Sequence, residues 1–182
     1  MPESPRVPRA RCSVGDGEGG ARPGAAPYDL HADDRDAIER EIQHYDDPRG
    51  ASIAALKIVQ KRHGWVPDGA IPEIGKLLGI SAADVEGVAT FYSLIFRRPV
   101  GRHVIKICDS VACFLMGCEQ VKSALAQQLG VGLGETTADG RFTVLPICCL
   151  GACDRSPVLM IDDDTLPEVS PQQLGQLLER YP

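Results

Sequence analysis

Two tight groups of cysteines constrain this chain more than any other feature of its sequence. The first lies within residues 108–118 and the second within residues 148–153, while Cys12 stands alone near the start. Secreted domains use even sets of cysteines in disulfide frameworks, so an odd, clustered set of seven favours metal binding or redox chemistry. The grouped cysteines are Cys108, Cys113 and Cys118, followed by Cys148, Cys149 and Cys153.

Charge and composition exclude several classes of function. The 182 residues include 19 Lys plus Arg against 25 Asp plus Glu, a formal net charge of -6, so the basic footprint of a nucleic-acid-binding protein is missing. A hydrophobic content of 43% can support a buried core. No stretch reaches the roughly 18 consecutive apolar residues of a membrane-spanning helix. We therefore expect a folded chain that neither binds nucleic acid nor inserts into the membrane.

The N-terminal segment lacks the features of an export signal. Several arginines occur there, but Gly, Pro and Asp16 follow them where a secretory signal needs an apolar core. Acidic residues such as Glu3 and Glu18 argue against a transit peptide. Large aliphatic residues are too sparse to offset the entropy of ordering, so residues 1–30 are expected to form a disordered tail.

Helical periodicity dominates residues 31–97, which we expect to form a helical docking domain. Ile38 and Ile42 lie one turn apart in a helix that Asp33 or Asp34 could cap. The apolar stretch at residues 91–96 is expected to pack between two domains, with a docking surface as the alternative. A second helix is expected from Ser52, which could cap it, to His63 with a stop at Gly64. The other expected helices run from Asp68 to Leu78 with a stop at Gly79, and from Ser81, whose spacing to Asp84 resembles a capping box, to Phe91.

The pattern changes to strands and helices over residues 98–182. Apolar patterning predicts strands at 103–107, 142–147 and 158–161, and a short fourth strand around Leu166 and Val169. Helices are expected from Phe114 to Leu129 and from Ser170 to Leu178. The expected fold class is α+β, with an N-terminal helical bundle followed by an α/β domain that contains a small mixed sheet.

Each cysteine group follows an expected strand, which suggests a common metal site. Cys108 and Cys113 bracket four residues, and Cys149 and Cys153 bracket three. Loops at the same edge of one sheet can bring four thiolates together, as a binuclear iron-sulfur cluster or a tetrahedral zinc ion requires. The spacing leaves both metals open.

Charges of both signs surround this expected site. An anionic cluster needs positive partial charge nearby, and a helix that begins just after Cys113 would direct its unpaired N–H groups toward it. Gly151 allows close approach of the backbone. Arg155 adds positive charge, whereas Asp109 and Asp154 would lower the reduction potential.

Three segments of the chain resemble one known family closely. They are ICDSVACFLMGC at residues 107–118, LPICCLGACDRSPVLMIDDDT at residues 145–165 and GVATFYSLIF at residues 87–96. These segments are similar to the 2Fe-2S E subunit of bacterial NADH:quinone oxidoreductase, the respiratory complex I. The resemblance extends from about Asp33 to Pro182 and leaves only the tail outside.

The resemblance implies a thioredoxin-like domain at residues 98–182 that holds one 2Fe-2S cluster on Cys108, Cys113, Cys149 and Cys153. It implies that the cluster exchanges one electron with the FMN of a partner subunit, which also binds NADH. Further iron-sulfur subunits are expected partners, and the isolated chain is not expected to turn over. The implied location is the cytoplasm, peripheral to the inner side of the cell membrane through the complex.

The remaining cysteines and the histidines receive no role from the family pattern. Cys148 is expected to be a buried small apolar residue, Cys118 a packing or partly exposed thiol, and Cys12 an idle thiol. The four histidines lack neighbours at ligand spacing and are expected at the surface or at helix ends. Ser156-Pro157 occupies the place where thioredoxin-like folds often keep a cis-proline.

The sequence leaves three alternative functions open. The equivalent subunit of a soluble NAD-linked formate dehydrogenase or hydrogenase shares the cysteine pattern, although Asp109-Ser110 and DGRF at residues 139–142 look more like the respiratory form. A structural zinc module would be colourless, and a solitary thioredoxin-like ferredoxin would diffuse between partners. GVGLG at residues 130–134 follows a helix rather than a strand, so it is not a dinucleotide-binding fingerprint.

Overall fold

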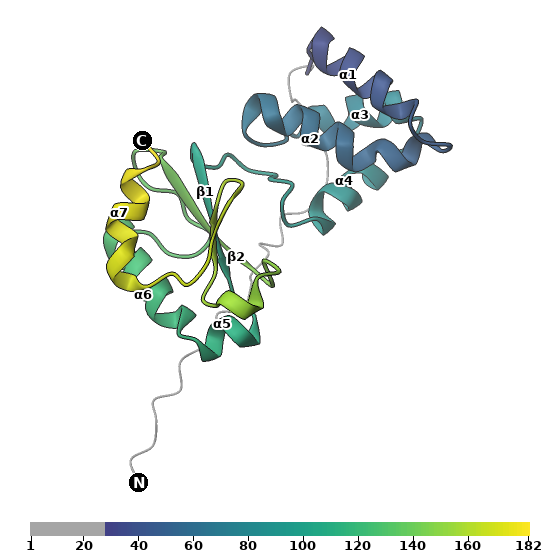
Figure 1. Ribbon diagram of the computed structural model, residues 1–182. Helices are drawn as coiled ribbons and strands as arrows, with labels where there is room; N and C mark the ends of the chain where they lie inside the picture. The colour runs from purple at the N-terminus through teal and green to yellow at the C-terminus, as the bar shows by residue number, and fades with distance from the viewer. Residues whose placement is uncertain (1–27) are drawn as a thin grey trace.

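The computed structural model describes residues 28–182, so residues 1–27 of the tail expected at residues 1–30 lie outside that range. Two hydrophobic cores form separately, one among the helices of residues 28–95 and one around a sheet in residues 105–181 (Figure 1). Leu30, at the end of the expected tail, is buried in the first core. Within residues 28–182, no helix combines the length and the apolarity that crossing a bilayer requires.

Four helices build the first core. They are α1 (Ala32–Ile42), α2 (Ser52–His63), α3 (Ala70–Leu78) and α4 (Ala82–Phe91), with a 3-10 turn at Pro48–Ala51 before α2. Gly64 and Gly79 end α2 and α3 in the left-handed conformation, as their positions in the sequence predict. The capping box at the start of α4 is confirmed, because Ser81 and Asp84 each accept a hydrogen bond from the other's backbone N–H.

The starts of α1 and α2 differ from the prediction. His31, rather than Asp33 or Asp34, caps α1 by accepting a hydrogen bond from the Asp33 backbone N–H at 3.3 Å. The Asp34 carboxylate is buried and accepts two hydrogen bonds from the Arg62 guanidinium, at 2.6 and 2.8 Å, which hold the pKa of this carboxyl below its ordinary value. Ser52 lies inside helical backbone that the 3-10 turn has already begun, so it does not cap α2.

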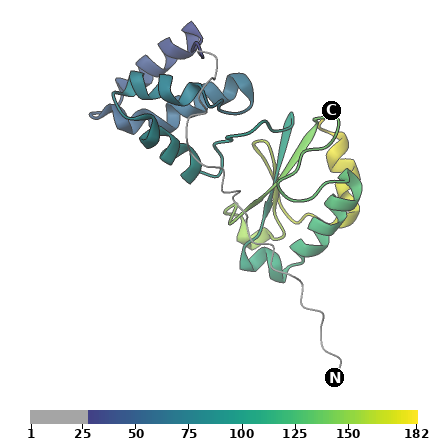
Figure 2. The same cartoon turned by 180° about the vertical axis from the view of Figure 1, so that it is seen from behind.

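The second core surrounds a four-stranded mixed sheet. Its strands are β1 (His103–Cys108), β2 (Phe142–Ile147), β3 (Leu159–Ile161) and β4 (Asp164–Leu166), in the order β2-β1-β3-β4. β1 and β2 run parallel, whereas β3 pairs with β1 and β4 pairs with β3 in antiparallel directions. Figure 2 shows the chain that leads from α4 into β1. The prediction of a small mixed sheet is therefore confirmed.

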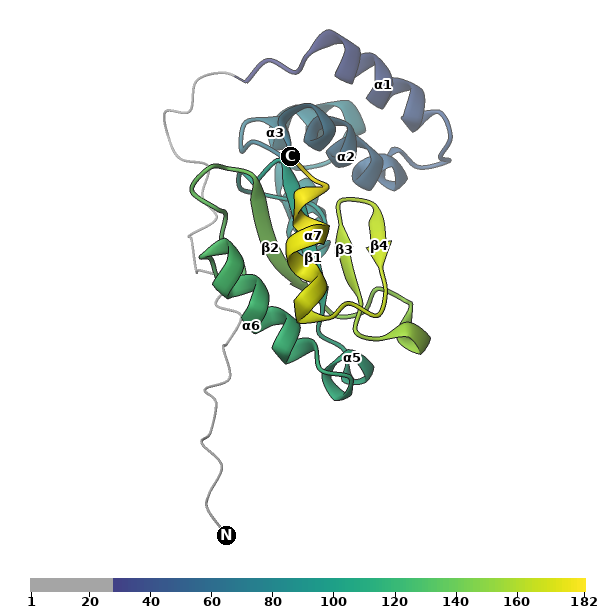
Figure 3. The same cartoon turned by 60° about the vertical axis from the view of Figure 1, so that its left-hand side comes forward.

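Helices α6 (Cys118–Leu129) and α7 (Leu174–Glu179) cover one face of the sheet (Figure 3). Val121, Leu125 and Leu174 from these helices are buried in the same core as Ile105 and Ile107 of β1. At the start of the last helical segment, Ser170 and Gln173 form a second capping box.

A single helix from Phe114 to Leu129 was expected, but the structure has two. Gly117 adopts a φ of +96°, in the left-handed region, and separates the short α5 (Val111–Leu115) from α6. A residue with a Cβ is strained in that conformation, so glycine permits the break. The chain therefore changes direction between Cys113 and Cys118.

Candidate metal centre

The topology of the sheet brings the two cysteine groups to one edge. β1 and β2 are parallel neighbours and end in register, with Cys108 opposite Ile147. Their pairing continues past the strands, because the Asp109 N–H donates to the Ile147 carbonyl at 2.8 Å. On the other side, the Cys108 N–H donates to the Val158 carbonyl at 3.2 Å. The loops that follow β1 and β2 therefore start side by side, as carboxyl ends of parallel strands do.

The first loop buries both of its proposed ligands. Cys108 is the last residue of β1, and Cys113 lies on α5 with no exposed surface. The prediction that a helix begins just after Cys113 was wrong, since α5 begins at Val111 and includes that cysteine. Its first turn is closed by the hydrogen bond from the Phe114 N–H to the Ser110 carbonyl at 2.8 Å.

The second loop exposes its cysteines. Cys149 and Cys153 are exposed, and their Sγ atoms lie 3.6 Å apart. Gly151, at φ +82°, turns the backbone so that its N–H points to the Cys149 Sγ at 3.3 Å. Cys148 is exposed as well, which contradicts the expectation that it is buried. β2 ends at Ile147, and its side chains are buried only from Phe142 to Val144, so Cys148 lies beyond the covered part of the strand.

Apolar packing and one serine hold the two loops together. Leu150 and Ala152 of the second loop pack against a small buried cluster, which consists of Cys108, Cys113, Cys118 and Val158. The buried Ser156 bridges the loops, because its hydroxyl accepts a hydrogen bond from the Cys113 thiol at 3.4 Å and donates to the Cys153 carbonyl at 2.9 Å. The Ser156-Pro157 peptide bond is cis, as expected by analogy. Cys118 is a fully buried packing thiol.

The surroundings shift the pKa values of three thiols in different directions. Burial opposes ionisation of Cys108, but hydrogen bonds from the Ser110 side chain and backbone outweigh it and place the pKa of this thiol below its ordinary value. Burial raises the pKa of Cys118. The hydrogen bond with Cys149, and then the charge of that thiol, raise the pKa of Cys153. A thiolate is the form that binds metal. A metal cation bound by Cys149 and Cys153 would therefore offset the repulsion between their two negative charges.

Two of the four proposed sulfur atoms already lie at the spacing of ligands on one metal ion. With Zn–S bonds of about 2.3 Å, a tetrahedral zinc ion needs every sulfur within about 3.8 Å of the others. Cys149 and Cys153 meet that distance, but among residues 28–182 no three of the four proposed sulfur atoms lie within 4.8 Å of one another. A binuclear cluster binds two thiolates at each of two iron atoms, and Cys149 with Cys153 has the spacing of one such pair.

A second group of possible metal-binding side chains already contacts a cationic side chain of the protein. Oxygen and sulfur atoms of Asp109, Cys118 and Glu119 lie within 4.8 Å of one another. The Lys122 ammonium donates to both carboxylates, at 2.6 and 2.7 Å, and so takes the place that a cation would need. We therefore assign no metal to this group.

The first loop itself carries several exposed apolar side chains. Val111, Phe114, Leu115 and Met116 are 57–77% exposed, although all four are large and hydrophobic. They come from α5 and the residue after it, the same short segment that carries Cys113. We call these four residues the α5 patch. Contiguous exposed apolar side chains of this kind are typical of protein interfaces.

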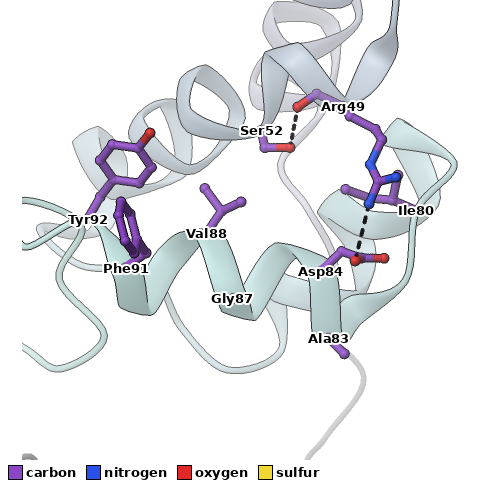
Figure 4. A pocket seen from close by; sticks show the side chains of 9 residues that line it. All are labelled: Arg49, Ser52, Ile80, Ala83, Asp84, Gly87, Val88, Phe91 and Tyr92. Atoms are coloured by element: carbon purple, nitrogen blue, oxygen red, sulfur yellow. Dashed lines mark hydrogen bonds and ion pairs between the residues drawn. The ribbon is translucent and has the colours of Figure 1, made fainter.

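A cavity of about 420 Å³ lies among the helices, away from the cysteines (Figure 4). The ion pair of Arg49 and Asp84, with a 3.2 Å separation, lies on one side of it, and Phe91 and Tyr92 lie on the other. Since its two charged groups neutralise each other, the cavity offers no excess charge to a phosphate. The apolar stretch at residues 91–96 is divided, because Ile95 is buried in the helical core while Phe91 is 80% exposed.

Sequence reasoning missed three residues at the metal centre. Ser110, Ser156 and Lys122 contact cysteines or the loops that carry them, yet a lone serine or lysine has no distinctive spacing. The only available signal was position: Ser110 lies between two cysteines, Ser156 precedes the expected cis-proline, and Lys122 follows Cys118 by one helical turn.

Two of the histidines lie away from the metal centre, with His31 at the start of α1 and His103 bonded to Asp162 at 2.7 Å. Cys12 lies outside the described residues.

Comparison with known proteins gives a consistent result. The model of the family described as "Thioredoxin-like [2Fe-2S] ferredoxin" matches residues 38–182. The E subunit of NADH-quinone oxidoreductase from Pseudomonas aeruginosa PAO1 is 64% identical over 152 residues, which cover 84% of this chain and 92% of that protein. The E subunit from Escherichia coli K12 is 58% identical over 160 residues, with 88% and 96% covered.

A solved structure shows a similar fold at lower identity. The NAD+-reducing [NiFe]-hydrogenase in its air-oxidized state aligns with a TM-score of 0.59 at 22% identity, over 74% of this chain and 22% of that chain. At this identity the likeness concerns the fold alone. The relatives with high identity over most of their length carry the name of the E subunit of NADH-quinone oxidoreductase, which favours the respiratory form over the soluble hydrogenase or formate dehydrogenase.

Proposed function

Because this chain belongs to the thioredoxin-like 2Fe-2S ferredoxin family, as an E subunit of NADH-quinone oxidoreductase, we propose that it exchanges one electron at a time with the FMN of a partner subunit. Its cofactor is a 2Fe-2S cluster, and it acts within an oxidoreductase complex. One observation carries the proposal: two loops that follow parallel strands, each with a pair of cysteines, pack together beside an exposed apolar patch. When bound, such a cluster accepts and returns single electrons.

The proposed ligands are Cys108, Cys113, Cys149 and Cys153. The donor set fits the cofactor, since thiolates are the ligands of 2Fe-2S clusters and the second pair is already at 3.6 Å. Groups of this chain stabilise negative charge on the sulfur atoms: the Gly151 N–H points to Cys149, and the Ser110 hydroxyl lies 3.3 Å from the Cys108 Sγ. Cys118 and Cys148 are left outside the set because the family pattern assigns neither as a ligand; Cys118 is buried in the same cluster as Cys108 and Cys113, and Cys148 is exposed beside Cys149.

The proposed partner is the subunit that binds FMN and NADH, together with further iron-sulfur subunits of the same complex. The α5 patch supports this, because it is large, apolar and exposed, and it shares a helix with Cys113. An electron carrier needs its site close to the partner's cofactor, so the docking face should be adjacent to the thiols. We propose that assembly covers the α5 patch and places the chain on the cytoplasmic side, peripheral to the inner side of the cell membrane.

The two separate hydrophobic cores support the proposal that the two parts of the chain have different roles. We propose that residues 31–97 form a helical docking domain and residues 98–182 the cluster-binding domain. Every proposed ligand lies in the second, and the cavity between Arg49 and Tyr92 lies in the first.

The test is spectroscopy of the anaerobically purified full-length chain, with iron and zinc analysis, before and after dithionite. We expect about two iron atoms per chain, a brown colour, and a spin-half electron paramagnetic resonance signal that develops on reduction. Mixing with the separately purified flavin subunit should then give a stable complex. Stoichiometric zinc with no signal would support a structural zinc module instead, and NADH oxidation by the single chain would overturn the assignment of NADH and FMN to the partner.

A further inference from the structure

Lys122 connects the cluster site to the helix that covers the sheet. It lies on α6, and its side chain is only 14% exposed. Its ammonium donates to the Asp109 carboxylate at 2.6 Å and to the Glu119 carboxylate at 2.7 Å. Asp109 directly follows the proposed ligand Cys108, so this contact ties the loop between Cys108 and Cys113 to α6.

The three charges lie close to the sulfur atoms of the site. Cys118 is fully buried in the cluster that includes Cys108 and Cys113. Carboxylate oxygens of Asp109 and Glu119 lie within 4.8 Å of the Cys118 Sγ, and the Lys122 ammonium contacts both carboxylates. These three charged groups therefore border the buried cluster that contains the proposed ligands Cys108 and Cys113.

Electrostatics gives the direction in which these charges shift the reduction potential of the site. A 2Fe-2S site with four thiolates carries a formal charge of about -2 when oxidised and about -3 after one electron is added, by ionic count. Positive charge nearby favours the reduced form, and negative charge opposes it. Asp109, Glu119 and Lys122 together carry a net charge of about -1 at neutral pH. Because Lys122 is largely buried, solvent screens its charge less than that of a surface lysine.

We propose that Lys122 sets the reduction potential of the 2Fe-2S cluster by offsetting the charges of Asp109 and Glu119, and that it positions the loop that carries Cys108 and Cys113. The inference rests on the proposed ligands and on the proposed one-electron role. Lys122 is a positioning residue, since its ammonium contacts carboxylates rather than sulfur. One electron enters the site, and no bond forms or breaks.

The experiment is a redox titration of the full-length holoprotein, followed by electron paramagnetic resonance, with iron content measured for every variant. Lys122→Met should shift the midpoint potential in the negative direction, because two carboxylates are left without their cation. Asp109→Asn and Glu119→Gln should each shift it in the positive direction. The double variant Lys122→Met with Asp109→Asn restores a net charge of about -1 and should return the midpoint toward that of the wild type.

The opposite signs separate an electrostatic role from a structural one. If Lys122 only held the loop, then Lys122→Met and Asp109→Asn would break the same contact and shift the potential in the same direction. Lys122→Arg keeps the charge and should keep the potential. Lys76→Met is the matched control, since Lys76 also pairs with a glutamate three residues away, at 2.6 Å, but on α3 in the helical region; it should leave the midpoint unchanged.

Failure of the inference and failure of the proposed function give different results. A wild-type protein with a full cluster whose variants all shift in one direction, or do not shift, would overturn the role of Lys122 alone. A wild-type protein purified anaerobically without iron would overturn the proposed function, and this inference with it.

Discussion

The two loops of the metal centre supply the same kind of ligand from opposite environments. In the first, Cys108 and Cys113 are buried at the end of a strand and on a short helix. In the second, Cys149 and Cys153 are exposed in a turn that Gly151 shapes. The difference indicates that packing fixes the thiols of the first loop, whereas the second loop is anchored by Leu150, Ala152 and Ser156 while its thiols are exposed, so we expect the second loop to depend more on the metal. Changes to the ligands, the metal and the surrounding residues should therefore act unequally on the two loops.

The largest effect is expected from removing a ligand. Cys113→Ala and Cys153→Ala should both lose the cluster completely, because each removes one of four thiolates. Their metal-free forms should differ, however. Cys113→Ala deletes a buried sulfur and should lower the free energy of unfolding by about 1–2 kcal/mol, while Cys153→Ala should change it by less than about 0.5 kcal/mol. Iron analysis and chemical denaturation of the apoproteins measure the two quantities.

Cys148→Ala is the control for this pair, since Cys148 is exposed beside Cys149 but is not a proposed ligand. It should keep its iron and its spectrum. Loss of iron from Cys148→Ala together with retention in the Cys149→Ala variant would reverse the assignment of the ligand in the second loop. Equal destabilisation of the two apoproteins would contradict the asymmetry between the loops.

Metal removal should have the next largest effect. A cluster that joins Cys113 to Cys149 closes a loop of about 36 residues, and treating it as a cross-link gives a stabilisation of roughly 4 kcal/mol in the chain-entropy model. Anaerobic chelation should therefore lower the melting temperature. In hydrogen exchange, the backbone amides of residues 149–155 should lose more protection than those of residues 108–118, because packing retains the first loop. Equal loss in both loops would show that neither is formed without metal.

Of the two loops, only the first carries the α5 patch, the proposed docking surface. Phe114→Glu should weaken binding to the flavin subunit by about 1.4–2.8 kcal/mol, or roughly ten- to a hundredfold, because it places a charge in a desolvated contact. Leu133→Glu is the control, since Leu133 is also an exposed large apolar residue but lies in the connection between α6 and β2. Binding measured by interferometry, with iron content checked in both variants, gives the comparison. Equal weakening by the two variants would place the docking face elsewhere.

Much of the fold could be predicted because its signals are local. The Ser81 capping box, the glycine stops at Gly64 and Gly79, and the alternation in β1 each depend on residues a few positions apart. The meeting of the two cysteine loops at one sheet edge followed from strands that end just before them. The pattern of strands and helices also predicted a mixed sheet, which the structure confirms.

The errors arose where contacts between distant residues decide the outcome. The burial of Cys148 was predicted from residue type, but it depends on where the sheet ends and what covers it. The break at Gly117 was missed because the apolar spacing continues across it. Lys122 was overlooked because its two partners belong to different segments, and only the folded loop brings Asp109 to α6. Local pattern therefore located the site, while its electrostatic surroundings required the tertiary structure.

The smallest expected effect concerns the backbone of the second loop. Gly151 has a φ of +82°, and a Cβ built there would meet nothing within 4 Å, so Gly151→Ala is opposed by backbone strain alone and should destabilise the apoprotein by about 1 kcal/mol. Gly175→Ala is the matched control, because Gly175 has equal free space but lies in α7 at a negative φ, where alanine should stabilise by about 0.4–1 kcal/mol. If the metal holds the second loop, the strain should also appear as faster loss of iron to a chelator from Gly151→Ala than from the wild type. An unchanged rate of iron loss would mean that the exposed loop is held by its own packing, as the buried loop is.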